Sequence, residues 1–271
     1  MSAATTAVGA PGGLSARVGP VEGLRQTMTL AWRTLVQIRH NPIELLDFSI
    51  QPIIFVLLFT FVFGGAIAGS PGQYLTFALP GIIVMNAFFV TMYTGLGLNT
   101  DLTKGVFDRL RSLPIARWAP LTGRIGADLV KQAWSIVLLL AVGMILGFRI
   151  RASMVGVLGM FAIVLLFMLA FSWVSVLIGV LAKDPERVQA FGYTALFPIT
   201  FVSNVFVETT SMPGWLQSVV KANPVTILSD ASRGLLIAGP VAEPVLYSLL
   251  WAAAITVAFA PLSVWAFRRR V

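Results

Sequence analysis

The charged residues that could do chemistry are concentrated in one segment that follows a long apolar stretch. No Asp, Glu, Lys or Arg occurs between Phe48 and Thr100. Charged side chains then return at Asp101, Lys104, Asp108, Arg109 and Arg111. On a helix, the first three of these and Arg111 fall on one face with alternating sign, and the other side is apolar up to Pro114, which ends the pattern. The spacing predicts a short amphipathic helix that presents charge to a soluble partner. A solvated helical cap after a membrane span would show the same pattern.

Residues for catalysis and metal binding are scarce. The chain has no cysteine and a single histidine, His40, which argues against disulfides, thiolate chemistry, histidine metal clusters and catalytic triads. A phosphate-binding loop ends in Gly-Lys-Ser/Thr, and none of the four lysines is followed by Ser or Thr. We therefore expect no catalytic residues, no metal, no cofactor bound by this chain and no ATP hydrolysis by it.

The composition is that of a membrane protein. Hydrophobic residues make up 57% of the chain and charged residues 11%, whereas soluble domains carry roughly 25% charged residues. The mean hydropathy is +0.87 and the pI is about 10.6. A high pI would suit nucleic-acid binding, but the basic residues lie at the ends of apolar runs, where they set membrane topology. We expect membrane lipid rather than nucleic acid as a partner.

The apolar runs predict an all-α integral membrane protein with six transmembrane helices. Residues 1–20 are rich in small residues and predict a disordered tail. Residues 21–47 predict a basic amphipathic helix that lies in the membrane interface. The transmembrane domain then occupies residues 48–271, with runs long enough to cross a hydrocarbon core of roughly 30 Å. These runs are 49–69, 76–98, 130–148, 154–181, 188–207 and 246–267.

The distribution of basic residues predicts the orientation. With six spans both termini share a side, and 15 of the 19 Lys and Arg residues lie on it. The positive-inside rule then places both termini and the 101–124 loop in the cytoplasm. At the start of the third span, Asp128 and Lys131 are three residues apart and predict an ion pair.

The segment 208–243 does not read as a simple loop. Its apolar stretches are too short to cross the membrane, and prolines and glycines interrupt them. Irregular backbone is tolerated at membrane depth only where protein or a water-filled cavity covers it. We expect a helical hairpin that enters from the outside, with Trp215 at interfacial depth and an ion pair between Asp230 and Arg233.

Two motifs resemble those of the ABC-2 family of exporter permeases. KGVFDRLRSLPIAR, which starts at Lys104, is similar to the cytoplasmic loop of the daunorubicin-resistance (DrrB-like) branch. PGWLQSVVKANPVTILSDASR, which starts at Pro213, is similar to a second hallmark of the family. The matching positions in the second motif are Pro213, Trp215, Leu216, Asn223, Pro224, Thr226, Asp230 and Arg233. The similarity covers residues 24–270 and implies six spans, an N-terminal interfacial helix and an external re-entrant pair before the last span.

The resemblance also implies a coupling role for the 101–111 segment. In this family the loop docks on a separate ABC ATPase subunit, which binds ATP and Mg, and two permease copies share two such subunits. The implied complex contains a permease dimer, expected to be a homodimer, in a bacterial plasma membrane. The coupling residues that we predict are Asp101, Lys104, Gly105, Phe107, Asp108, Arg109, Arg111 and, from the N-terminal helix, Arg33.

A substrate path is predicted from aromatic and polar residues in the spans, because stacked rings suit flat amphiphilic molecules. The candidates are Met85, Asn86, Tyr93, Phe191, Tyr193, Phe197 and Phe201, although ordinary packing would also use them. The implied function is ATP-driven export of a hydrophobic or amphiphilic drug or antibiotic by alternating access.

Three alternatives stay open on the sequence. A lipid or glycan exporter would share the family features. An ion-coupled secondary transporter usually holds an ionisable group within a span, and the charge-free runs 49–100, 132–148, 152–182 and 244–267 leave none there. Glu208 is the lone carboxylate near a span end and fits an exposed loop acid. A membrane scaffold without transport activity is the third alternative.

Overall fold

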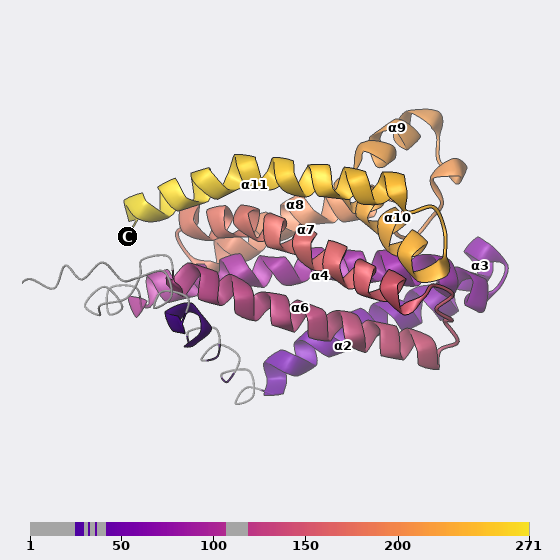
Figure 1. Cartoon of the computed structure of the whole chain (residues 1–271), viewed down its shortest axis with the longest axis horizontal. Coiled ribbons are helices and arrows are strands. Elements are labelled where there is room, and N and C mark those ends of the chain that lie inside the picture. Colours follow the sequence, from indigo (N-terminus) through magenta and orange to yellow (C-terminus); the bar gives the residue numbers. More distant parts are fainter. Residues whose placement is uncertain (1–24, 30–31, 33–35, 37–41, 107–118, 271) are drawn as a thin grey trace, which may run out of the picture.

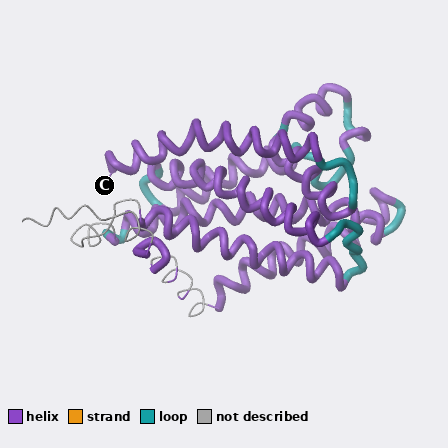
Figure 2. Tube along the Cα trace, in the orientation of Figure 1, coloured by secondary structure: helices purple, strands orange, loops and turns teal. Residues whose placement is uncertain are grey.

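The computed structural model describes residues 25–29, 32, 36, 42–106 and 119–270 of the 271-residue chain. This part of the chain is helical and contains no β-strand (Figure 2). The prediction of an all-α protein is therefore confirmed. The tail predicted at 1–20 lies outside the described residues, as does much of the predicted interfacial helix.

Among the described residues, five stretches are long and apolar enough to cross a membrane. The first runs through α2 (Pro42–Leu58), a π-helical turn (Phe59–Phe63) and α3 (Gly64–Ala68). The others lie in α4 (Pro71–Thr103), α6 (Ala119–Ile145), α7 (Met154–Leu181) and α11 (Ala242–Arg270). Each overlaps one of the predicted apolar runs, and α7 has the predicted bounds, whereas the runs 49–69 and 130–148 extend past the ends of α3 and α6. The multi-pass membrane architecture is confirmed for these five.

The run predicted as a fifth span, 188–207, forms a shorter element. Helix α8 (Pro185–Phe201) has 17 residues, which at 1.5 Å per residue is about 25 Å and less than a hydrocarbon core of roughly 30 Å. Residues 202–207 continue it as a series of bends that are mostly buried. Pro198 lies in the last turn of α8, where its ring interrupts regular helix. The count of six spans therefore remains a prediction.

Two short helices follow this bend. Helix α9 (Gly214–Ala222) and helix α10 (Pro224–Ile237) are separated only by Asn223. The Asn223 side chain accepts a hydrogen bond from the Val225 N–H at 2.8 Å, so it caps α10, and Pro224 occupies the first turn. This combination of a polar cap and a following proline favours a sharp helix start. It recurs in α4 with Ser70 and in α8 with Asp184.

Helix α4 forms the centre of the bundle, and α6, α7, α8 and α10 pack around it (Figure 1). Its closest neighbour is α7. A Cβ atom built on Gly179 would lie 2.4 Å from the Gly95 carbonyl oxygen, and one built on Gly95 would lie 2.2 Å from the Ser175 carbonyl oxygen. Because Cβ atoms do not occur at such distances, the two helix backbones touch where they cross.

The bundle has two distinct ends. Figure 1 shows the C-terminus of α11 at one end and α3 and α9 at the other. We call these the C-terminal end and the α9 end. The end of α7 lies at the C-terminal end, where Arg270 contacts it. The turn between α6 and α7 lies at the α9 end, where the Arg151 N–H donates to the Leu236 carbonyl of α10 at 3.0 Å.

The prediction of a single helix across residues 101–113 is wrong at the start of this range. Asp101 belongs to the last turn of α4, which runs to Thr103 and is capped by Lys104. Gly105 follows with a φ of 65°, a left-handed conformation that ends helices. Asp101 therefore belongs to a membrane-crossing helix, and Lys104 caps its end.

Candidate functional site

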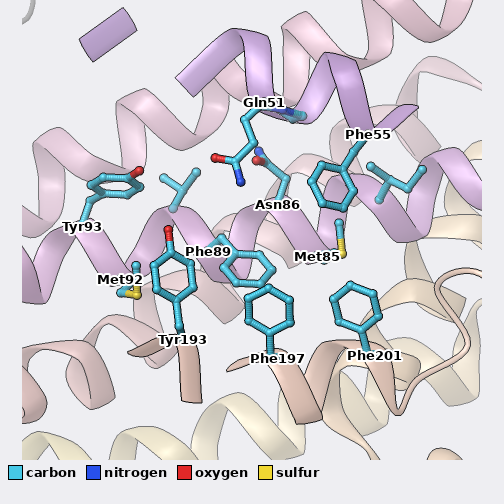
Figure 3. A pocket seen from close by; sticks show the side chains of 13 residues that line it. Gln51, Phe55, Met85, Asn86, Phe89, Met92, Tyr93, Tyr193, Phe197 and Phe201 are labelled. Atoms are coloured by element: carbon cyan, nitrogen blue, oxygen red, sulfur yellow. The ribbon is translucent and has the colours of Figure 1, made fainter. Parts of the chain in front are cut away.

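A cavity lies between α2, α4 and α8 (Figure 3). Its volume is about 60 Å³, far below the roughly 300–1,000 Å³ of sites for drug-sized ligands. The cavity is therefore closed in this conformation, and a larger molecule would enter only after its walls separate. The lining residues are Gln51, Pro52, Phe55, Ile82, Met85, Asn86, Phe89, Val90, Met92, Tyr93, Tyr193, Phe197 and Phe201.

Six of the seven residues predicted for a substrate path lie around this one cavity, and Phe191 does not. Helix α4 contributes Met85, Phe89 and Tyr93, and helix α8 contributes residues 193, 197 and 201. Each set is spaced by four residues, so each forms a row on one helix face. Phe191 is two positions before the α8 row, lies on another side of the helix and is 60% exposed. Phe89 was missed, although its four-residue spacing from Met85 and Tyr93 was a usable signal.

The rings of the two rows contact one another across the cavity wall. Phe89 lies 5.7 Å from Phe197 in an edge-to-face arrangement and 6.1 Å from Tyr193, measured between ring centroids. Phe197 and Phe201 stack at 5.3 Å. Such aromatic pairs add about 0.5–1.5 kcal/mol each beyond their buried area. A flat aromatic molecule could replace these ring-ring contacts with contacts to itself.

Polar groups interrupt the aromatic lining. The side-chain amides of Gln51 and Asn86 lie beside each other, and the hydroxyl groups of Tyr93 and Tyr193 lie farther along the cavity (Figure 3). Asn86 donates to the Ser135 hydroxyl of α6 at 2.7 Å, which fixes its orientation. An apolar lining with a few placed polar groups is typical of sites for amphiphilic ligands.

A buried arginine organises the α9 end of the bundle. Arg233 of α10 donates to the Asp230 carboxylate at 2.9 Å, to the Phe77 carbonyl at 2.9 Å and to the Asn204 carbonyl at 2.6 Å. Its guanidinium also lies 4.0 Å from the centre of the Phe77 ring. The predicted Asp230–Arg233 pair is confirmed.

Two asparagines complete this group, which we call the Arg233 cluster: Asn204, Asn223, Asp230 and Arg233. Asn204 donates to Asp230 at 2.7 Å, and Asn223 donates to the carbonyls of Ile199 and Val202 at 2.7 and 2.6 Å. These carbonyls belong to the end of α8 and the bend after it, where regular helical bonding stops. The cluster therefore satisfies backbone groups that would be costly to bury unpaired.

Pro213 and Trp215 of the second motif lie apart from the cluster, whereas the Thr226 hydroxyl accepts from the Asn204 N–H at 3.2 Å. Pro213 precedes α9, and Trp215 in its first turn is 73% exposed. Asn204 was missed by the sequence reasoning, because its main partners are distant in sequence and no spacing pattern reveals them. Glycine at position 81 makes room for the bend, because a Cβ there would lie 3.0 Å from the Val205 Cα.

An ion-pair chain joins α4 to α6 near the C-terminal end. Asp101 pairs with Arg124 at 2.8 Å, and Asp128 pairs with Lys131 at 3.4 Å, as predicted. Arg124 also lies 4.0 Å from Asp128. Gly97 leaves space for Arg124, since a Cβ there would lie 1.3 Å from a guanidinium nitrogen. Asp101 therefore faces a neighbouring helix of its own chain.

The other predicted coupling residues are placed only in part. Lys104 is exposed, and Gly105 forms the turn after α4. Phe107, Asp108, Arg109, Arg111 and Arg33 lie outside the described residues. A few residues before Arg33 in the sequence, residues 25–29 are helical. The Thr27 hydroxyl lies 3.2 Å from the Thr122 hydroxyl of α6. The N-terminal helix thus contacts α6 beside the ion-pair chain.

Comparison with known proteins identifies the family of this bundle. The family model described as "ABC-2 type transporter" matches residues 25–237. The chain belongs to the ABC-2 transporter family. The matched range includes both motifs, so the resemblance inferred from them is confirmed. It also includes the α4 and α8 rows that line the cavity.

Several relatives of this ABC-2 chain have names that describe drug resistance. It is 38% identical over 244 residues to the daunorubicin resistance ABC transporter permease protein DrrB1 of Streptomyces coeruleorubidus, covering 90% of this chain and 86% of the relative. It is 26% identical to the probable doxorubicin resistance ABC transporter permease protein DrrC of Mycobacterium tuberculosis H37Rv, covering 88% and 87%. It is 21% identical to the probable multidrug ABC transporter permease YbhR of Escherichia coli K12, covering 73% and 54%.

Proposed function

We propose that this protein is the transmembrane permease subunit of an ATP-driven ABC exporter that moves a hydrophobic or amphiphilic, drug-like molecule out of the cell. The observation that carries the proposal is the aromatic cavity between α4 and α8, lined by two facing rows of rings and a few polar groups. The name of the relative with 38% identity, a daunorubicin resistance permease, supports a flat amphiphile as the cargo.

The proposal includes a six-span topology with both termini in the cytoplasm. Helix α8 with the buried bend at 202–207 would form the fifth of the six crossings, and the excess of basic residues on the side of the termini supports the orientation. Helices α9 and α10 would form the external re-entrant pair. The complete burial of Leu228, Ala231 and Leu236 in α10 supports an element enclosed by the bundle, and the exposed Trp215 suits the interface.

The energy source is a separate ABC ATPase subunit, which would bind ATP and Mg. Its proposed docking surface is the 101–111 segment together with Arg33 of the N-terminal helix. Lys104 and Gly105 form the described start of this surface. A second permease copy would complete the transporter, and membrane lipid would surround it.

The mechanism that we propose is alternating access. The closed cavity of about 60 Å³ would widen when ATP-driven movement of the 101–111 segment displaces α4 and α8 relative to α2. The rings of the two rows would then separate and stack on the cargo. The Arg233 cluster would keep the outer end of α8 attached to α10 during this movement.

A second candidate, lipid export, is favoured by a second apolar groove of about 520 Å³ that α7, α8, α9, α11 and the start of α10 line. Its lining includes Phe171, Ile178, Ile199 and Trp251, and its volume falls within the roughly 300–1,000 Å³ of ligand sites. A groove with so few polar groups suits an acyl chain. The mixed lining of the α4–α8 cavity suits an amphiphilic drug better.

Transport by the purified complex tests these functions directly. The permease and its ATPase subunit, reconstituted in proteoliposomes, should accumulate daunorubicin only with ATP and Mg, and collapse of the proton gradient should leave the rate unchanged. A fluorescent phospholipid in the same vesicles measures lipid movement. ATP-dependent lipid movement without drug transport would show that the cargo is a lipid. Transport driven by the proton gradient would refute the proposed energy source.

A further inference from the structure

The C-terminal turn of α7 is bound by side chains from two other helices. The last carbonyl groups of a helix have no partner within it. In α7 the carbonyls of Gly179, Val180 and Ala182 receive hydrogen bonds from Asn99 of α4 and Arg270 of α11. We call this arrangement the α7 end junction.

The α7 end junction is closely fitted. The Asn99 amide donates to the carbonyls of Gly179 and Ala182 at 2.8 Å each, and Asn99 is fully buried. The Arg270 guanidinium donates to the Ala182 carbonyl at 2.6 Å and also contacts the Val180 carbonyl. A cation at this position is also favoured by the negative end of the helix dipole.

On the α4 side, the α7 end junction adjoins the predicted coupling segment. Asn99 lies one turn beyond Gly95, where the backbones of α4 and α7 touch. Asp101 follows two residues later, and α4 ends at Thr103. The last turns of α4 are thus attached to α7 by a backbone contact and by a buried amide, so they cannot shift without moving the end of α7.

On the other side, the α7 end junction adjoins the helix that lines the cavity. Only Lys183 and Asp184 separate Ala182 from Pro185, the first residue of α8. The Asp184 carboxylate accepts from the Arg187 N–H at 2.9 Å and caps α8. Two residues give little slack, so displacement of the α7 end is passed to the start of α8 and along its row of rings.

We propose that Asn99 and Arg270 are positioning residues that couple the 101–111 segment to the cavity. Movement of this segment displaces the end of α4, the α7 end junction carries the displacement to the end of α7, and α8 follows. Arg270 keeps the end of α11 in the same unit. The inference rests on the proposed function, because it takes the ATPase subunit to act on the 101–111 segment.

Uncoupling of transport from ATP hydrolysis is the readout that separates positioning from a merely structural role. In proteoliposomes with the ATPase subunit, Asn99→Leu and Arg270→Gln should lower daunorubicin transport per ATP hydrolysed at least tenfold, with ATPase activity within about twofold of wild type. Arg270→Lys, which keeps the positive charge, should restore part of the transport per ATP hydrolysed. Arg269→Gln is the matched control, because Arg269 stacks over Trp265 at 4.0 Å, away from the α7 end, and should behave as wild type.

Hydrogen exchange of the isolated permease tests the α7 end junction without any transport. Asn99→Leu and Arg270→Gln should speed exchange of the amides 183–188 at least tenfold, and Arg269→Gln should not. Unchanged exchange would overturn the α7 end junction itself. Faster exchange with unchanged daunorubicin transport per ATP hydrolysed would overturn the coupling role. An equal fall of transport and ATPase activity would overturn it as well. Absence of ATP-driven transport in the wild type would instead refute the proposed function, and the coupling role with it, while exchange still decides the contact.

Discussion

Phe89 and Phe197 meet edge to face, with ring centroids 5.7 Å apart and ring planes at 70°. They come from α4 and α8, and each belongs to a row of cavity residues spaced by four positions. We propose that such ring pairs keep the cavity closed, because they occupy the space that a cargo molecule would need. This relationship leads to the first prediction.

Replacement of Phe197 by alanine should weaken cargo binding more than replacement of Phe191. Loss of an aromatic contact costs about 0.5–1.5 kcal/mol, or roughly a 2- to 10-fold rise in the KM for daunorubicin transport. Phe191→Ala is the matched control, since this ring is on the same helix and does not line the cavity. Equal effects of the two substitutions on KM would place the binding site elsewhere.

The Arg233 cluster should be more sensitive to loss of the arginine than to loss of the aspartate charge. Arg233→Met leaves the carbonyls of Phe77 and Asn204 without their donor, and each buried polar group left unpaired costs about 1–3 kcal/mol. The Asp230 side chain is 43% exposed, so Asp230→Asn should cost below about 1 kcal/mol. Thermal unfolding of the purified permease in detergent measures both. A lower melting temperature for Asp230→Asn than for Arg233→Met would contradict the central position of Arg233 in the cluster.

The crossing of α4 and α7 should not tolerate a methyl group. Gly179→Ala places a Cβ 2.4 Å from the Gly95 carbonyl oxygen, so the helices must separate and lose packing, at a cost of about 1–3 kcal/mol. A Cβ on Gly126 of α6 meets nothing within 4 Å. Gly126→Ala should therefore stabilise the protein by up to about 1 kcal/mol through helix propensity. Melting temperatures that move in the same direction would contradict the close approach.

The coupling segment should require its charges for communication with the ATPase subunit. Asp108→Arg combined with Arg111→Glu should abolish drug-stimulated ATPase activity of the complex, because the partner's charges then face like charges. The amount of permease inserted in the membrane, measured by immunoblotting of the membrane fraction, should be the same as for wild type. Full stimulated activity in this variant would remove the coupling role from the segment.

The local features of the molecule were predictable because their signals are local. Apolar runs located the membrane-crossing helices, and the spacing of three residues revealed the pairs Asp128–Lys131 and Asp230–Arg233. Six of the seven path residues, proposed because they are aromatic or polar residues within spans, line one cavity. Whether this cavity carries cargo remains a prediction.

The features that the sequence did not reveal depend on distant partners or on backbone conformation. Asp101 matched the charged face of a following helix, but Arg124, 23 residues away, pairs with it, and the left-handed Gly105 ends α4 before residue 108. Asn99 donates to the Gly179 carbonyl, 80 residues away, and main-chain acceptors leave no trace in residue types. Asn204 donates to the Asp230 carboxylate, 26 residues away, and its own carbonyl accepts from Arg233. Helix α8 was overestimated in length because apolar composition continues through its terminal bend.

The attachment of α8 to protein at both ends has a consequence for the lipid environment. Helices held only by their apolar length adjust to a thicker or thinner bilayer by tilting. Helix α8 begins three residues after Ala182, which Asn99 and Arg270 bind, and its far end is bonded to Asn223. One wall of the cavity should therefore depend little on acyl-chain length, and its geometry should stay constant when the thickness of the surrounding membrane changes.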